Sequence, residues 1–170
     1  MIIFINGAFG AGKTTVAEGL AARLPNSLLF DPEEVGYFLR AVLRPIDHPD
    51  DFQHLPLWRT LTVQTAGLLR ATYGRDLIMP MTIWHRPYFA EVIGGLRALD
   101  PDFHHFCLTA RPETLQARLR GRGDAPGGFA WNHIACCVAA FPDPLFARQI
   151  PTDNRTPGDL IAAILDAVGR

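Results

Sequence analysis

The chain has 170 residues, a net charge of −1 and 48% apolar residues. This length fits one hydrophobic core, so we expect residues 1–170 to form a single domain. The near-zero net charge disfavours a nucleic-acid partner, and no apolar run approaches the roughly 20 residues of an integral membrane segment. The start lacks a signal-peptide pattern, and the three cysteines are an odd number, which together predict a cytoplasmic protein.

Short apolar strands alternate with amphipathic helices along the chain. The predicted strands are 2–6, 28–30, 77–83, 103–108 and a short last one at 149–150. The predicted helices are 14–24, one that starts at 31–34, 57–73, 87–99, 113–120, 129–140 and one capped by 156–159. Residues 44–56 are predicted to be an irregular connector, and residues 121–128 to lack regular structure. The alternation predicts an α/β fold, with five parallel strands and helices on both faces of the sheet.

Residues 7–14 match the pattern G-x-x-x-x-G-K-[ST] in full and join the first predicted strand to the first predicted helix. The glycines let successive backbone N–H groups point at a phosphate, and the helix N-terminus adds partial positive charge. Lys13 would reach the β- and γ-phosphates of ATP, and Thr14 would offer a hydroxyl to Mg²⁺. The predicted nucleotide-binding residues of this segment are Gly7, Ala8, Phe9, Gly10, Ala11, Gly12, Lys13, Thr14 and Thr15. The alternative is an incidental glycine-rich turn.

Lys13 is the only lysine among 16 basic residues. A chain that otherwise uses arginine favours, at this position, a role that needs a compact point charge rather than a planar guanidinium. We therefore predict Lys13 to be catalytic as well as nucleotide-binding.

The motif and the alternation resemble the small nucleoside- and metabolite-kinase branch of the P-loop superfamily, such as the shikimate, gluconate and chloramphenicol kinases. The resemblance implies a three-layer P-loop NTPase fold with strand order 2-3-1-4-5 and a mobile lid after the fourth strand, here at approximately 119–130. A helical segment at approximately 32–73 would form the substrate side.

P-loop enzymes usually place an acid at the carboxyl end of a second strand. The third predicted strand ends in no acid, and Asp76 lies at its amino end, away from the crevice where ligands bind. Asp31 follows the second strand, where the small metabolite kinases place a catalytic or metal-associated Asp. We predict that Asp31 orients the acceptor hydroxyl and contacts Mg²⁺ through water. Alternatively it only caps the helix that begins with Pro32, and the two roles are compatible.

Arg118 and Arg122 are four residues apart at the start of the glycine-rich segment, so they share one helix face. The kinase resemblance implies that such lid arginines close over the phosphates and stack on adenine, with Arg118 also catalytic. The alternative is a solvated basic helix face. Asn154, in the turn after the last strand, lies where relatives contact adenine.

The segments 51–59 and 81–85 should border the crevice. Together with NGAFGAGKT, DPEEVG and the turn at 152–154, they resemble the ATP-binding tunicamycin-resistance protein family over nearly the whole chain. The resemblance implies ATP-dependent resistance to a nucleoside antibiotic, most simply by phosphorylating a hydroxyl of the drug or of a related sugar nucleotide. Two alternatives stay open: an ATP-dependent binding protein that sequesters the drug without phosphoryl transfer, and a regulatory P-loop NTPase that acts on a protein.

Three further residues are candidates to contact the acceptor. Arg59 could hold an anionic group, or anchor its helix to Asp50 or Asp51. Trp58 could stack on a uracil or a sugar, or belong to the core. His85, at the carboxyl end of the third strand, could be a polar contact or a proton relay. The sequence does not indicate the acceptor itself, the oligomeric state or a preference for ATP over GTP.

Overall fold

The computed structural model describes residues 1–170 and is built around a five-stranded sheet with the order β2-β3-β1-β4-β5. All four strand pairs are parallel. The architecture and strand order confirm the prediction from sequence. The strands are β1 (Ile2–Gly7), β2 (Ser27–Leu29), β3 (Asp76–Pro80), β4 (Phe103–Thr109) and β5 (Gln149–Pro151). Because β1 is central and buried along its whole length, the loop that follows it opens at the middle of the carboxyl edge.

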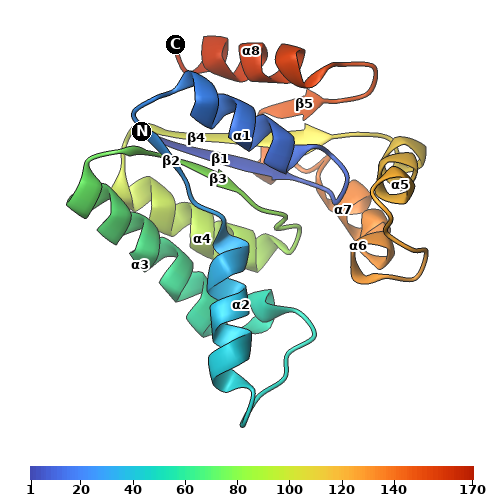
Figure 1. The fold of residues 1–170 in the computed structure, drawn as a ribbon, viewed down its shortest axis with the longest axis horizontal. Coiled ribbons are helices and arrows are strands. Elements are labelled where there is room, and N and C mark those ends of the chain that lie inside the picture. Colours follow the sequence, from blue (N-terminus) through green and yellow to red (C-terminus); the bar gives the residue numbers. More distant parts are fainter.

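Helices cover both faces of the sheet (Figure 1). On one face α1 (Lys13–Arg23) packs against α8 (Pro157–Ala167), and on the other α3 (Pro56–Tyr73) packs against α4 (Arg86–Leu99). No helix is both long enough and apolar enough to cross a membrane.

Two groups of helices flank the carboxyl edge of the sheet. The first comprises α5 (Pro112–Gly121), α6 (Phe129–Asn132) and α7 (Ile134–Ala140), followed by the short η2 (Pro144–Phe146). The second is α2 (Pro32–Leu43), which projects from the sheet together with the connector that contains η1 (Phe52–His54) (Figure 1). The site described below lies between these two groups.

Strand β3 ends at Pro80, earlier than the predicted 77–83. Beyond it, side chains take over from the backbone ladder. The Thr82 hydroxyl donates to the Gly7 carbonyl (2.8 Å), and the Asn6 amide both donates to the Ile83 carbonyl and accepts from the Ile83 N–H (2.9 Å each). These bonds fix the segment after β3 against the end of β1, so its course is set by side chains that strand periodicity does not reveal.

The predicted helix 129–140 is two helices, interrupted at His133. His133 has φ −94° and ψ −3°, outside ideal helical geometry, and its Nδ1 lies 2.7 Å from the Phe129 carbonyl. Its ring packs on Phe129 (4.2 Å between centroids) and near Phe9 (6.3 Å). The rings on either side of this break thus pack beside Phe9 in the loop after β1.

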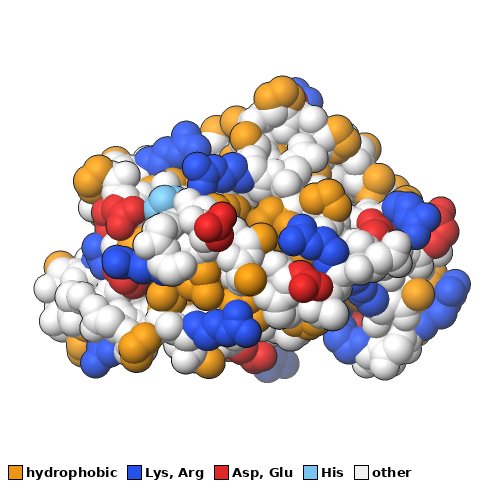
Figure 2. Space-filling model, turned by 90° about the horizontal axis from the view of Figure 1, so that it is seen from above, with side chains coloured by type: hydrophobic (Ala, Val, Ile, Leu, Met, Phe, Trp, Pro, Cys, Tyr) orange, Lys and Arg blue, Asp and Glu red, His pale blue; other side chains and the backbone are white.

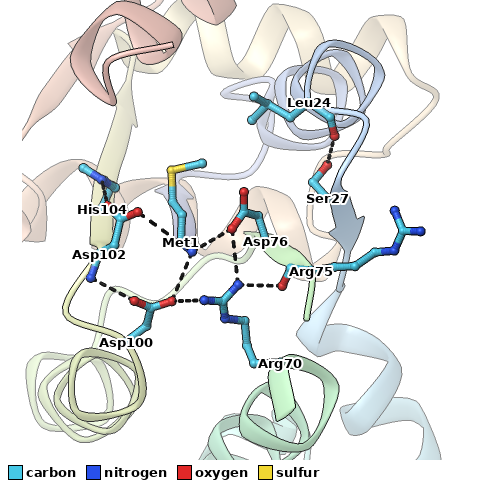
Figure 3. Close-up of polar contacts among 9 residues, drawn as sticks. All are labelled: Met1, Leu24, Ser27, Arg70, Arg75, Asp76, Asp100, Asp102 and His104. Atoms are coloured by element: carbon cyan, nitrogen blue, oxygen red, sulfur yellow. Dashed lines mark hydrogen bonds and ion pairs between the residues drawn. The ribbon is translucent and has the colours of Figure 1, made fainter. Parts of the chain in front are cut away.

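An ionic cluster joins the amino ends of the strands, opposite the site (Figure 3). The Met1 ammonium contacts Asp76 (2.7 Å) and Asp100 (3.1 Å), and Arg70 pairs with both carboxylates. Burial acts to raise the pKa of Asp100, but hydrogen bonds from the Asp102 N–H and the ammonium, with the Arg70 charge, hold it below its usual range. Asp76 thus serves this cluster and lies away from the carboxyl edge, as its place in the sequence predicts.

Basic and acidic side chains are interspersed on the face shown in Figure 2. They are not gathered there into extended areas of one sign, which is the distribution expected from the near-zero net charge.

Candidate active site

A cleft of about 780 Å³ opens at the carboxyl edge of the sheet, between the loop after β1 and helix α2. We call its two parts the P-loop end and the α2 end. The P-loop end is lined by Phe9, Gly10, Gly12, Lys13, Thr14, Thr15, Arg118, Arg122, Asp124, Phe129 and Ala130. The α2 end is lined by Asp31, Glu33, Tyr37, Arg40, Asp50, Asp51, Phe52, Gln53, Pro80 and Met81.

The loop after β1 has the backbone geometry of an anion cradle. At Gly7 a Cβ atom would lie 2.6 Å from the Leu108 carbonyl oxygen, so only glycine allows the loop to pass this close to β4. Gly12, the residue before α1, has φ 95°, and a Cβ there would project into open space. The N–H groups of Lys13, Thr14 and Thr15 have no acceptor within the chain. An anion at this helix terminus would therefore receive unpaired donors and the positive end of the helix dipole.

Lys13 lies over this cradle. Its Nζ donates to the Ala8 carbonyl (3.0 Å) and lies 5.6 Å from the centre of the Phe9 ring. The pKa of Lys13 is lowered from its ordinary 10.5 to about 8, mainly by burial; the Arg122 charge acts in the same direction, and Cys137 and Glu33 oppose it. The ammonium thus has no carboxylate partner in the structure, and a phosphate would supply the missing counter-charge.

Asp31 faces the same cleft from the end of β2. One carboxylate oxygen accepts the Glu33 N–H (2.9 Å), which makes Asp31 the N-cap of α2. Burial raises the pKa of Asp31, and the neighbouring Glu33 and Glu34 charges add to the rise. The cap and the cleft position coexist, because a cap residue at the carboxyl end of a strand already points toward the ligand-binding edge.

Arg118 and Arg122 both line the P-loop end, so they share one side of α5 and its C-cap, as their four-residue spacing predicts. Arg118 donates to the carbonyl and the hydroxyl of Thr152 (2.9 Å each) and more weakly to the Gly10 carbonyl (3.4 Å). Arg118 therefore joins the cradle to the loop after β5. Arg122 pairs with Asp124 (2.7 Å) at the surface, so its charge remains close to solvent.

The segment 119–130 contacts the cradle near both of its ends, through Leu119, which lies against Gly10, and through Phe129. The Phe129 ring, at the start of α6, packs edge-on against Phe9 in the loop after β1, with 5.7 Å between centroids. Phe129 is otherwise exposed. The predicted lid region is thus held at its two ends, where Leu119 is buried in the core and Ala130 packs against it, whereas most residues between them are exposed.

Trp58 lies in the core and not in the cleft. Its side chain is fully buried, and its indole N–H donates to the Pro32 carbonyl (2.9 Å). Its ring packs on Phe52 (5.4 Å between centroids) and cannot face a ligand, so the core interpretation holds and the substrate contact does not.

Arg59 and His85 also lie beside the cleft rather than along it. Arg59 is 8% exposed, donates to Glu91 and to the Gln53 carbonyl (2.6 Å each), and stacks on Tyr88. Arg59 anchors its helix, as one alternative proposed, but to Glu91 of α4 and to the Gln53 carbonyl of the connector, and not to Asp50 or Asp51. His85 packs on Tyr88 with 4.0 Å between ring centroids, and its buried Nδ1 has no partner.

Asn154 lies at the surface with φ 55° and does not line the cleft. Its neighbour Asp153 holds the turn by accepting from the Thr114 hydroxyl (2.6 Å) and from Arg111. The turn therefore approaches the P-loop end through Thr152 and Arg118, not through Asn154 itself.

The structure adds residues at the α2 end that the sequence analysis did not single out. Tyr37 donates to Glu33 (2.9 Å), and Arg40 lies over the Phe52 ring and donates to the Asp50 carbonyl. The helical spacing of Glu33, Tyr37 and Arg40 was a usable signal, since positions four and three apart share a face. The connector gave no comparable signal, because its irregular backbone has no period.

The residues present fit a phosphate chain with Mg²⁺. The unpaired amides and Lys13 suit phosphate oxygens, and the exposed Thr14 at the first turn of α1 can supply a hydroxyl ligand to the metal. The segment after β3 provides no acid, so Asp31 is the candidate to order the metal's water.

A phosphate cradle at the end of the central strand, in a sheet of this order, defines a P-loop kinase-like fold, which implies nucleotide binding. A family model described as an AAA domain matches residues 2–131, and the chain belongs to this family. No curated protein sequence matches the chain significantly.

Solved structures extend the similarity to the full length. The tunicamycin resistance protein of Deinococcus radiodurans is 27% identical, with a TM-score of 0.82, and the match covers 99% of this chain and 95% of that one. The resemblance stated from the sequence motifs is thereby confirmed. A sugar kinase from Janibacter sp. HTCC2649 is 22% identical, with a TM-score of 0.68 and coverage of 97% and 92%. A shikimate kinase from Acinetobacter baumannii is 19% identical, with a TM-score of 0.61 and coverage of 98% and 92%; these two share the fold.

Proposed function

We propose that this protein is an ATP- and Mg²⁺-dependent phosphotransferase that modifies a hydroxyl of a nucleoside antibiotic such as tunicamycin, or of a related sugar nucleotide. The observation that carries the proposal is that Lys13 and Asp31 line one cleft from opposite ends. The similarity to a tunicamycin resistance protein supports the choice of acceptor, and the kinase neighbours support the type of reaction.

The P-loop end would hold the nucleotide. The free amides of Lys13, Thr14 and Thr15 would bind phosphate oxygens, and Thr14 with water ordered by Asp31 would hold Mg²⁺, which neutralises phosphate charge when bound. Arg118 and Arg122 would add positive charge from α5 and help to exclude water.

In the transfer step, Asp31 orients the acceptor hydroxyl toward the γ-phosphorus. The new O–P bond forms as the bond to the β-phosphate oxygen breaks, and the hydroxyl proton passes to Asp31. Lys13 stabilises the charge on the transferred group. Because the acceptor proton leaves late in a loose transition state, orientation matters more than the basicity of Asp31.

Sequestration of the drug without transfer is the second candidate, and one observation favours it. No acid follows β3, and Asp31 already accepts a hydrogen bond as a helix cap. A site with this arrangement could bind ATP and drug together without activating the hydroxyl.

The two candidates differ in the mass of the acceptor after incubation. Protein, Mg-ATP and either tunicamycin or UDP-N-acetylglucosamine are incubated and the products weighed by mass spectrometry. Transfer predicts a gain of about 80 Da on the acceptor with matching release of ADP. Unmodified acceptor that binds only when ATP is present would support sequestration. If the acceptor is neither modified nor bound, both candidates are contradicted. The Lys13→Ala variant, prepared in parallel, controls for contaminating kinases.

A further inference from the structure

Ionisable side chains divide the cleft into two parts of opposite sign. The P-loop end carries Lys13, Arg118 and Arg122 against the single carboxylate of Asp124. The α2 end carries four carboxylates, those of Asp31, Glu33, Asp50 and Asp51, against the single guanidinium of Arg40.

The charges at the α2 end are not neutralised by one another. None of the four carboxylates forms an ion pair, and neither does Arg40. Arg40 donates instead to the Asp50 backbone carbonyl (2.6 Å) and lies over the Phe52 ring, 5.0 Å from its centre. Four negative charges and one positive charge leave the α2 end at −3 when all groups are ionised.

A second guanidinium lies beside the α2 end but cannot add to the charge of Arg40. Arg59 is buried and paired with Glu91, so it cannot reach an anion in the cleft. Asp50 is exposed, and like charges within about 8 Å repel measurably at physiological salt. An acceptor with a phosphate or carboxylate at this end would meet four carboxylates, with the single guanidinium of Arg40 as the only cation at that end to offset them.

The same surface suits hydroxyl groups and uncharged rings. Carboxylates accept hydrogen bonds from hydroxyls, and Asp31 and Glu33 keep oxygens for this in addition to their bonds with the Glu33 N–H and Tyr37. Phe52, Tyr37 and Met81 supply apolar area on which a sugar or a base can pack.

We infer that Glu33, Asp50 and Asp51 select an acceptor that is rich in hydroxyls and carries no anionic group at the α2 end. The inference rests on the proposed function and narrows it: the uncharged nucleoside antibiotic is the acceptor, and the sugar nucleotide with its pyrophosphate is excluded. Selection arises from repulsion of the wrong ligand as well as from contacts with the right one.

The test measures binding and not turnover. Tunicamycin and UDP-N-acetylglucosamine are titrated by calorimetry into protein saturated with Mg²⁺ and a non-hydrolysable ATP analogue. We expect tunicamycin to bind at least about tenfold more tightly. We expect Glu33→Gln with Asp50→Asn to strengthen UDP-N-acetylglucosamine binding about tenfold at low salt and to lose this gain in concentrated salt. The same variant should weaken tunicamycin binding, because two charged acceptors of hydroxyl hydrogen bonds are removed.

Glu34→Gln is the matched control, because Glu34 is an exposed acid on the same helix that does not line the cleft. It should leave both affinities unchanged, and Asp50→Asn alone should act in the same direction as the double variant. The inference is overturned if the sugar nucleotide binds more tightly than tunicamycin, if the double variant affects both ligands equally, or if neither ligand binds. Failure of phosphate transfer would appear only in the mass measurement, so the two proposals fail separately.

Discussion

The two ends of the cleft are built in different ways. The P-loop end is centred on consecutive residues of one loop, with free backbone N–H groups and one ammonium, and residues between Arg118 and Ala130 complete it. The α2 end is formed by side chains from the β2–α2 junction, the connector and the segment after β3. A site made of backbone is defined by a short sequence pattern, whereas a site made of side chains depends on how distant segments pack. The first end can therefore be recognised from sequence alone, and the second can be described only from the fold.

The largest expected effect comes from replacing Lys13, which acts on the P-loop end alone. Lys13→Ala should lower affinity for ATP at least about hundredfold and abolish transfer, since it removes the charge that faces the phosphates. Calorimetry measures the affinity, and the melting temperature should remain within a few degrees because the lost ammonium is desolvated and has no carboxylate partner. Arg23→Ala, on the exposed last turn of the same helix, serves as the control. If Lys13→Ala bound ATP as tightly as wild type, the P-loop end would not be the nucleotide-binding site.

The next effect should fall on turnover and spare nucleotide binding. Asp31→Asn is expected to lower the rate of transfer about 10²- to 10³-fold while ATP affinity changes less than about threefold. Asn caps helices about as well as Asp, so α2 should remain intact and the loss can be assigned to the charge. The readouts are initial rates of ADP formation with acceptor present, together with ATP titrations. Asp143→Asn is the matched control, an N-cap outside the cleft; a rate unchanged in Asp31→Asn would reduce that residue to a cap.

The smallest effect is a pH dependence that only the P-loop end should show. The pKa of Lys13 is lowered to about 8 in the free protein, and phosphate binding favours the ammonium. Binding must then take up a proton above pH 8, so ATP affinity should be constant below that pH and fall up to about tenfold per unit above it. Calorimetry at pH 8.5 in buffers of different ionisation enthalpy measures the uptake directly. An ATP affinity that does not change from pH 7 to 9.5 would contradict the placement of Lys13 at the phosphates.

The same shift predicts a trend in stability. The unfolded chain holds the Lys13 proton up to about pH 10.5 and the folded chain only up to about 8. Between these values the unfolded state binds more protons, so this residue makes the free energy of unfolding rise with pH. Denaturant titrations at several pH values in this window give the free energy of unfolding. Its increase with pH should be steeper in wild type than in Lys13→Ala.

The sequence predicted the sheet and the cradle because these follow from local patterns, and the strand order followed from the resemblance to the small P-loop kinases. Apolar runs mark buried strands, and glycines with one lysine mark a phosphate loop. It placed Asp31 at the cleft because a residue after a parallel strand lies at the carboxyl edge. The sequence did not predict the direction of side chains that could point either into the core or into the cleft. Nothing in the spacing of Trp58 shows that its indole bonds to Pro32, or that Arg59 turns to Glu91.

The placement of the three tryptophans makes the two ends of the cleft separately visible by fluorescence. Trp58 bonds to the Pro32 carbonyl, one residue after Asp31, so its emission should respond when an acceptor displaces α2. Trp131 lies in α6 with the Arg120 guanidinium 5.1 Å from its ring, where closure over a nucleotide would change quenching by that cation. With Trp84 replaced by Phe, and either Trp58 or Trp131 also replaced, two single-tryptophan variants would each report on one end of the cleft. Comparing them would show in real time the order in which the ligands bind.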